Sequence, residues 1–155
     1  MNIRLCRLED ESKWIELNRE FMNFEIHEEG LWNNTNNNTH ATFQHTFREA
    51  MKHPQLITLL LVELEGELIG FANLLTLYSV WAHGKAIVID DLFLRPEYHR
   101  RGFGRKIMVY IENLAKEQEY KRVQFQSEFS NPNAYAFYVS LGYEPTDMHF
   151  YAKYV

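Results

Sequence analysis

The sequence contains few residues that crosslink or interrupt a chain: one cysteine, four prolines and seven glycines among 155 residues. A single cysteine, Cys6, excludes an internal disulfide and cysteine-rich zinc sites, and we expect it to be a small buried residue at the start of a strand. The seven histidines show no His-Glu-x-x-His or comparable ligand spacing, and no serine elbow or catalytic triad is recognisable. We therefore expect neither a bound metal nor covalent catalysis.

Long apolar runs are also missing from the first segment, MNIRLCRLEDESKW, in which charged residues recur every few positions. This segment is too polar for a signal peptide or a membrane span, so we expect a cytoplasmic protein without a membrane partner. The net charge of −5 at pH 7 disfavours a general nucleic-acid binder and suits a cationic small substrate.

The hydrophobic share of 46% is enough for one core, and we expect a single domain over residues 1–155. Hydrophobic periodicity predicts the order β-α-α-β-β-β-α-β-α-β. Short turns join the three central strands into an antiparallel meander, whereas a crossover helix makes the next pair of strands parallel. The fold class is therefore α+β, with a mixed, mostly antiparallel sheet flanked by helices. The predicted strands are 2–8, 55–64, 68–80, 85–96, 122–129 and 148–155, and the predicted helices begin near residue 10, span 39–52, and open at residues 102 and 131.

A basic turn with two glycines, YHRRGFGRK at 98–106, stands directly before a predicted helix. The N-terminus of a helix offers about four backbone N–H groups without internal partners, together with a partial positive charge. Gly102 and Gly104 would let an anion approach these groups closely. A diphosphate is the ligand that best fits, although the same pattern also occurs where a helix and a strand simply pack tightly. Positive charge is added by Arg100, Arg101 and Arg105.

Two well-known nucleotide-binding patterns do not fit this turn. The dinucleotide fingerprint needs a third glycine, but position 107 is isoleucine, and the preceding strands form a meander. The longer P-loop pattern requires Gly-Lys-Ser/Thr, which the sequence does not contain.

Two adjacent aspartates, Asp90 and Asp91, interrupt the otherwise apolar strand predicted at 85–96. Burying a carboxylate is costly unless the group is paired or lies in a wet cleft. On a regular strand the two side chains point to opposite faces. We expect a functional role for at least one of them, and the alternatives are a bulge or a buried hydrogen bond.

Two segments, IDDLFLRPEYHRRGFGRKIM and NPNAYAFYVSLGYEP, together resemble the signature segments of the GNAT superfamily of N-acetyltransferases. The resemblance covers essentially the whole chain, and the predicted element order is the order of that fold. It implies an enzyme that uses acetyl-CoA and moves the acetyl group directly, in a ternary complex, to a primary amine of a small cationic acceptor. We further expect a homodimer with a small-molecule partner and no nucleic-acid partner.

The first of these segments implies the coenzyme site. In the family its glycines hold the coenzyme A pyrophosphate through backbone amides, with Gln or Arg at the position that His99 occupies here. The strand stretch after the two aspartates is implied to pair with the pantetheine arm through its main chain. The residues implied for coenzyme binding in this segment are Leu92, Phe93, Leu94, Arg100, Arg101, Gly102, Phe103, Gly104 and Arg105.

The second segment implies the general acid. It matches the family pattern Asn-x-x-Ala-x-x-Phe-Tyr-x-x-x-Gly-Phe/Tyr from Asn131 to Tyr143. Asn131 would cap a helix and contact the coenzyme together with Ala134, or it would serve as an N-cap alone. Tyr138, which stands at the family's tyrosine position, is implied to protonate the departing thiolate.

A third stretch, VWAHGKAIVIDDLFL, resembles the entry into the acidic strand of diamine and polyamine acetyltransferases, with one residue more between Trp81 and Gly84. In that branch the first aspartate removes a proton, often through water, and the second binds the cationic substrate. Asp90 and Asp91 are implied to have these roles. Trp81 would either contact the substrate or hold a turn in the core.

Acidic and aromatic residues near the end of the first helical region, Glu28 and Trp32 among them, would suit a cationic amine through charge and cation–π attraction. The alternative is a solvated acidic helix end. Three rival functions remain: an acyl-CoA-binding sensor without turnover, an acetyltransferase acting on protein or peptide amines, and an RNA-binding module that uses the basic turn.

Overall fold

The computed structural model describes residues 1–25 and 39–153. The chain divides into two compact units, Met1–Phe125 and Gln126–Val155, and each is described by itself. The single domain expected over 1–155 stays a prediction. Glu28 and Trp32 of the expected acceptor wall lie outside the described residues.

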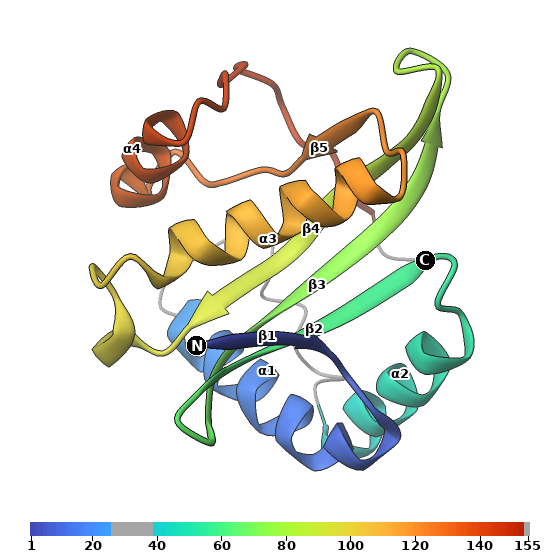
Figure 1. Ribbon diagram of the computed structural model, residues 1–155, viewed down its shortest axis with the longest axis vertical. Helices are drawn as coiled ribbons and strands as arrows, with labels where there is room; N and C mark the ends of the chain where they lie inside the picture. Colours follow the sequence, from blue (N-terminus) through green and yellow to red (C-terminus); the bar gives the residue numbers. More distant parts are fainter. Residues whose placement is uncertain (26–38, 154–155) are drawn as a thin grey trace. The chain divides into compact units, whose positions relative to one another are not determined.

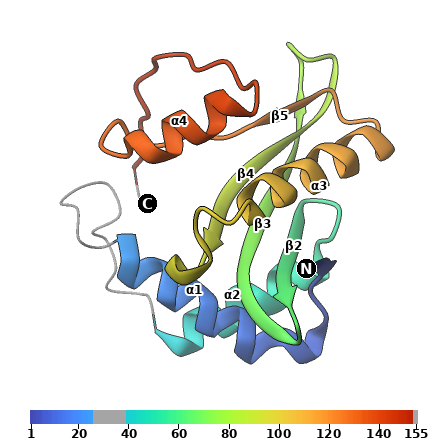
Figure 2. The same ribbon diagram turned by 60° about the vertical axis from the view of Figure 1, so that its left-hand side comes forward.

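The first unit is built on a five-stranded sheet with the order β1-β2-β3-β4-β5 (Figures 1 and 2). Neighbouring strands from β1 to β4 are antiparallel, whereas β4 and β5 are parallel because a helix crosses between them. This sheet confirms the predicted α+β class with a mixed, mostly antiparallel sheet. The strands are β1 Asn2–Leu5, β2 Ile57–Leu64, β3 Glu67–Ser79, β4 Gly84–Leu94 and β5 Arg122–Gln124.

Three helices of the first unit cover the two faces of this sheet. Buried side chains of the first two helices form one cluster with Leu59, Leu61 and Phe93, so these helices share a face. Leu60 and Val62 are fully buried on the opposite face, over which the third helix runs (Figure 1). The helices are α1 Glu11–Glu25, α2 His40–Lys52 and α3 Phe103–Glu117, with short 3₁₀ turns at Leu8–Asp10 and Pro96–Tyr98.

Local sequence explains where several of these elements begin and end. Thr39 caps α2, because its hydroxyl oxygen accepts a hydrogen bond from the Thr42 amide at 3.2 Å. The turn between β2 and β3 has positive φ angles at Glu65 (53°) and Gly66 (86°), as a two-residue hairpin requires. The predicted second helix and the predicted hairpin are therefore confirmed.

The predicted core face of α1 is also present, since Trp14 and Leu17 are only 3% and 1% exposed. Cys6 is buried as expected and joins the same cluster, but it follows the end of β1 and does not start a strand. Its burial raises the pKa of the thiol to about 12, so the sulfur is not a nucleophile near neutral pH.

The second unit contains one helix, α4 Pro132–Ser140, among its described residues. The Asn131 side chain caps it by accepting from the Ala134 amide at 3.0 Å, and Gly142 follows it with a φ of 89°. These ends agree with the prediction.

Three predicted strands differ from the structure. The strand expected at 2–8 ends at Leu5 as β1, because Leu8 already begins a 3₁₀ turn. The strand expected at 122–129 is reduced to β5, Arg122–Gln124. The strand expected at 148–155 is absent from its described part, 148–153. A strand needs a partner strand and a face to bury. In that segment the apolar side chains of Met148 and Tyr151 are 76% and 86% exposed, so the alternation of residue types does not correspond to a buried face.

Candidate active site

The two aspartates lie at an irregularity of β4. Asn73 of β3 pairs with Asp91, and the next residue, Leu74, pairs with Ile89, so Asp90 is left without a partner in β3. This is a β-bulge, one of the structural alternatives considered for the aspartate pair. Bulges bend a strand and re-aim its side chains, and here Asp90 is exposed while Asp91 is partly buried.

Asp91 accepts a short hydrogen bond from the Asn73 amide, with 2.7 Å between Nδ2 and Oδ2. Burial raises the pKa of Asp91 to about 6; the Asn73 hydrogen bond lowers it and the charge of Asp90 raises it. The carboxylate is therefore ionised at neutral pH, yet it is a stronger base than an ordinary aspartate with a pKa of about 3.9.

Asp90 adds a second carboxylate next to it. Its side chain is exposed, but the protein atoms around the bulge restrict its hydration and raise its pKa. Two adjacent carboxylates create a local negative charge that attracts an ammonium group.

One edge of β4 is open directly after the aspartates. On one side, Leu92, Phe93 and Leu94 pair with β3. On the other side, in the described part of the first unit, β5 pairs with β4 only over residues 86–88. Among the described residues of the first unit, no strand pairs with this side of residues 92–94, where the Leu94 carbonyl already has a side-chain contact. An extended ligand can add to such an edge like a strand.

The basic turn leads from this edge to α3. Gly102 is the N-cap of α3 and has a φ of 78°, a left-handed conformation that favours glycine. It has no side-chain oxygen to cap the helix, and a Cβ placed there would meet no atom within 4 Å. The start of α3 is therefore open to an anion, which the helix dipole favours.

Aromatic rings hold one arginine of the turn in place. The guanidinium carbon of Arg101 lies 5.5 Å from the ring centre of Tyr98 and 5.2 Å from that of Phe103. Phe103 is only 9% exposed, so its ring is not available to a ligand. Any contact of this residue with an anion would be made by its backbone amide. Arg100 has a positive φ of 58°. Gly104 and Arg105 lie in the first turn of α3.

His99 has a contact that sequence reasoning did not foresee. Its Nε2 lies 2.8 Å from the carbonyl oxygen of Leu94. A carbonyl only accepts, so Nε2 carries the hydrogen. His99 therefore binds the end of β4, where a ligand would add to the strand, and does not depend on the pyrophosphate for a partner.

The second unit contains the expected general acid. Tyr138 lies on α4, with its ring centre 5.0 Å from that of Phe137 and 6.4 Å from that of Tyr143. Burial raises the pKa of the Tyr138 phenol, which keeps it protonated near neutral pH. The Asn131 side chain accepts from the Ala134 amide and so caps α4. This contact fits both alternatives for Asn131, an N-cap alone and an N-cap that also contacts the coenzyme.

One family model matches most of the chain. Residues 14–143 match the model of the acetyltransferase (GNAT) family. The chain belongs to this family. The matched range contains both aspartates, the basic turn and Tyr138.

Individual relatives of this GNAT chain are distant. YhfO, an uncharacterised N-acetyltransferase of Bacillus subtilis (strain 168), is 29% identical over 86 residues, which are 56% of this chain and 58% of the relative. A thialysine N-epsilon-acetyltransferase of Caenorhabditis elegans is 30% identical over 66 residues, 43% of this chain and 41% of the relative. The chain thus spans about half the length of these curated relatives.

A solved structure shows the same fold over the whole chain. An aminoglycoside acetyltransferase from an uncultured soil metagenomic sample, in complex with sisomicin, has a TM-score of 0.78 at 18% identity. The comparison covers 99% of this chain and 96% of that one.

Trp81 lies at the turn between β3 and β4, and its side chain is 91% exposed. The alternative that it holds a turn in the core is therefore wrong. A contact with the acceptor stays a prediction.

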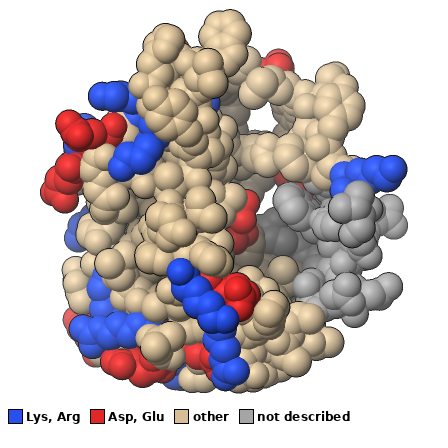
Figure 3. Space-filling view, turned by 90° about the vertical axis from the view of Figure 1, so that its right-hand side faces the viewer, with Lys and Arg blue, Asp and Glu red and all other residues tan. Residues whose placement is uncertain are grey.

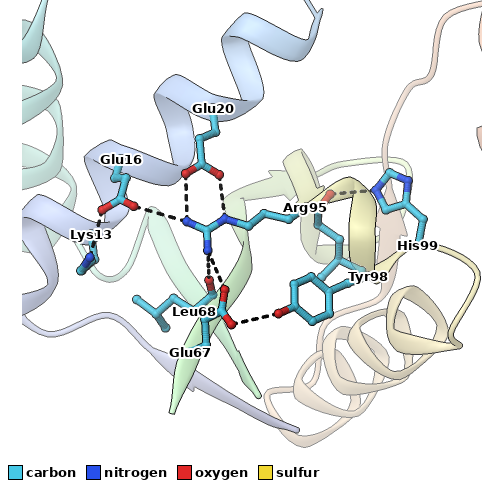
Figure 4. Close-up of polar contacts among 9 residues, drawn as sticks. Lys13, Glu16, Glu20, Glu67, Leu68, Arg95, Tyr98 and His99 are labelled. Carbon is cyan, nitrogen blue, oxygen red and sulfur yellow. Dashed lines mark hydrogen bonds and ion pairs between the residues drawn. The ribbon is translucent and has the colours of Figure 1, made fainter. Parts of the chain in front are cut away.

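Arg95 joins three segments of the GNAT chain's first unit (Figure 4). Its Nε donates to Glu20 of α1 at 2.8 Å, and its Nη1 donates to the Leu68 carbonyl of β3 at 2.9 Å. The hydrogen bond to Glu20 and the charges of the neighbouring carboxylates raise the pKa of Arg95. The segment that leads to the basic turn is thereby held against α1 and β3. Further partners are Glu16 and Glu67, and Glu67 also accepts from the Tyr98 hydroxyl.

A cavity of about 560 Å³ lies beside this ion-pair cluster. None of the predicted site residues in the described ranges lines it. Several of its charged side chains pair with one another, as Lys13 does with Glu16 and Arg4 with Glu63. The cavity therefore gives no support for a transfer site beside the ion-pair cluster.

Within residues 1–25 and 39–153, no helix is long and apolar enough to cross a membrane. The same residues contain no group of three or more histidine, cysteine, aspartate or glutamate side chains arranged around a metal. The cytoplasmic location and the homodimer stay predictions.

Sequence reasoning missed Asn73, the hydrogen-bond donor to Asp91, and its further contact Trp14. The available signal was an asparagine within the apolar run GFANLLTL. A buried polar residue in a strand requires partners.

Proposed function

We propose that this chain is an acetyl-CoA-dependent N-acetyltransferase that moves an acetyl group to a primary amine of a small cationic acceptor. The observation that carries the proposal is the open β4 edge at 92–94, followed along the chain by the uncapped start of α3 at Gly102. An edge for an extended chain followed by a site for an anion fits the pantetheine arm and pyrophosphate of coenzyme A.

In this proposal the coenzyme is held mainly by backbone groups. Amides of the first turn of α3 receive the pyrophosphate, and Arg100, Arg101 and Arg105 add positive charge. Residues 92–94 hydrogen-bond the pantetheine arm and thereby place the thioester along β4. Backbone donors tolerate changes of side chain, which explains why His99 can replace the usual Gln or Arg.

The acceptor amine must lose a proton before or during attack. An alkylamine resembles lysine, with a pKa of about 10.4, so fewer than about 1 in 1,000 molecules are neutral near pH 7. The raised pKa of Asp91, about 6, makes it the better proton acceptor of the two aspartates. We therefore assign Asp91 to proton removal and the exposed Asp90 to binding the cation, the reverse of the roles implied by the resemblance.

This assignment sets a pH dependence. Asp91 accepts a proton only in its ionised form, so kcat/KM should fall as the pH drops through the pKa of Asp91, about 6. The leaving thiolate is protonated by Tyr138, whose phenol stays protonated across the same range.

Three features support an acceptor with positive charge. The aspartate pair gives a local negative charge, and the whole chain has a net charge of −5. Two of the similar proteins are named for amine acceptors, thialysine and an aminoglycoside.

The proposal is tested by an acceptor screen with acetyl-CoA that measures thiol release and acetylated product. Polyamines, amino acids, aminoglycosides and peptide N-termini form the panel, with acetyl-CoA alone as the control for hydrolysis. We expect turnover with at least one polyamine or aminoglycoside. Calorimetric binding of acetyl-CoA without turnover of any acceptor would indicate the sensor instead, and turnover of peptides alone would indicate a protein substrate.

A further inference from the structure

A chain of buried polar side chains runs from α1 through β3 to the bulge of β4. Trp14, Asn18 and Asn73 are 3%, 5% and 7% exposed. Apolar side chains would fill this space without the desolvation cost that an indole N–H and two amides carry. The chain of polar groups ends at Asp91, which Asn73 contacts directly.

The orientation of the Asn73 amide is fixed by its partners. The indole Nε1–H of Trp14 can only donate, and it lies 3.0 Å from Oδ1 of Asn73. The amide nitrogen of Asn73 therefore faces the other way, toward Asn18 Oδ1 at 3.2 Å and Asp91 Oδ2 at 2.7 Å. Asn18 is itself oriented, because its Nδ2 donates to the Trp14 carbonyl at 2.7 Å.

Each hydrogen-bonding group of the Asn73 amide therefore has a partner, with two donors and one acceptor engaged. Asn73 also pairs directly with Asp91 across the two strands at the point where the register shifts. We infer that Asn73, locked in one orientation by Trp14 and Asn18, is a positioning residue that holds the Asp91 carboxylate ionised and aimed for the acceptor amine.

The electrostatic surroundings agree with this role. The hydrogen bond from Asn73 lowers the pKa of Asp91, whereas burial and the charge of Asp90 raise it. Asp90 is on the same strand as Asp91. The groups contributed by β3 and α1, which are Asn73 and, through it, Asn18 and Trp14, are uncharged. Asn73 is thus the contact that opposes protonation of Asp91.

The inference rests on the proposed function. Its test distinguishes a failure of the inference from a failure of the proposed function. Asn73→Leu keeps a similar volume and removes the donor. We expect the acid limb of kcat/KM to shift upward by about one pH unit, the size expected for losing a hydrogen bond to a charged group. We expect the same upward shift in the pKa of Asp91 measured by carboxyl NMR titration, which needs no turnover.

Trp14→Phe is the matched control. It breaks the same Trp14–Asn73 hydrogen bond, so both variants should melt at a lower temperature than the parent. In the control, Asn18 and Asp91 still accept from the Asn73 nitrogen. The amide loses one of its orienting contacts but keeps its bond to Asp91, so the shifts in the pH profile and in the Asp91 pKa should be much smaller than in Asn73→Leu.

Equal Asp91 pKa values in Asn73→Leu and the parent would overturn the inference, as would the same shift in Trp14→Phe. If Asn73→Leu does not fold, Asn73→Ser serves instead, because its shorter side chain no longer reaches Asp91. A parent that turns over no amine would contradict the proposed function, while the NMR titration would still decide the role of Asn73.

Discussion

Tyr138 stands at the tyrosine position of the family pattern and lies among aromatic side chains. Its ring packs against Phe137 and Tyr143, and burial raises the pKa of its phenol. A phenol with a raised pKa gives up its proton only in step with bond cleavage, when the sulfur that leaves has developed negative charge. Tyr138 is therefore suited to donate a proton to a thiolate and unsuited to act as a base.

Replacing Tyr138 with phenylalanine removes this proton and little else. We expect kcat for Tyr138→Phe to fall by about 100-fold or more, since general acids typically contribute that much. The dissociation constant for acetyl-CoA should change little, as calorimetry can measure. Tyr135→Phe is the control, because Tyr135 lies on the same helix and its side chain is 54% exposed. Equal losses of kcat in both variants would remove Tyr138 from the mechanism.

At the scale of elements, the start of α3 depends on one left-handed glycine. Gly102 has a φ of 78°, and the space around a Cβ at this position is empty. An alanine there would be strained by the backbone angle and would not collide with a neighbour.

We expect Gly102→Ala to lose about 1 kcal/mol of unfolding free energy. We also expect it to weaken acetyl-CoA binding several-fold, because the first amides of α3 shift or are screened by the new methyl group. Gly66→Ala is the matched control: Gly66 has a φ of 86°, its Cβ would also meet nothing within 4 Å, and it lies in the β2–β3 turn. Calorimetry and thermal melts of both variants check this. Similar melting losses with equal acetyl-CoA affinities would argue against a pyrophosphate site at Gly102.

Most of these elements could be predicted because their signals are local. Caps such as Thr39 and Asn131 stand within three residues of the amides they bind. A bulge was one of the alternatives for the aspartate pair, but the sequence could not decide for it, since it depends on which residue of β3 faces Asp91. The role of Asn73 was hidden for the same reason, because its partner Trp14 lies 59 positions away in the sequence. The resemblance supplied the candidate residues, but not the environments that separate Asp90 from Asp91.

At the scale of the whole molecule, the net charge is negative, −5 at pH 7. Basic and acidic side chains lie next to one another over the lower part of the face in Figure 3. Exposed ion pairs such as Arg48 with Glu11 and Lys52 with Glu49 are of this kind. Such pairs contribute little stability individually, so the net charge of −5 acts mainly on charged ligands.

We therefore expect the KM for a polyamine to rise several-fold between low salt and about 0.5 M salt, where the Debye length falls to a few ångströms. The kcat should stay constant, because the bound complex excludes most of the added ions. A singly charged amine is the control and should show a smaller rise. A KM for polyamines that is independent of salt would contradict an electrostatic attraction of the acceptor.

Because of the bulge in β4, Asp90 is an extra residue in the strand, without a partner in β3. Asn73 faces Asp91 and Leu74 faces Ile89, so removing the codon for Asp90 would leave every other cross-strand partner unchanged. The pairing of β3 with β4 would become regular, and Asp91 would keep its place opposite Asn73. A lineage with this fold could thus gain or lose its second acidic group in one genetic step, and change its preference for cationic acceptors without rebuilding the strand.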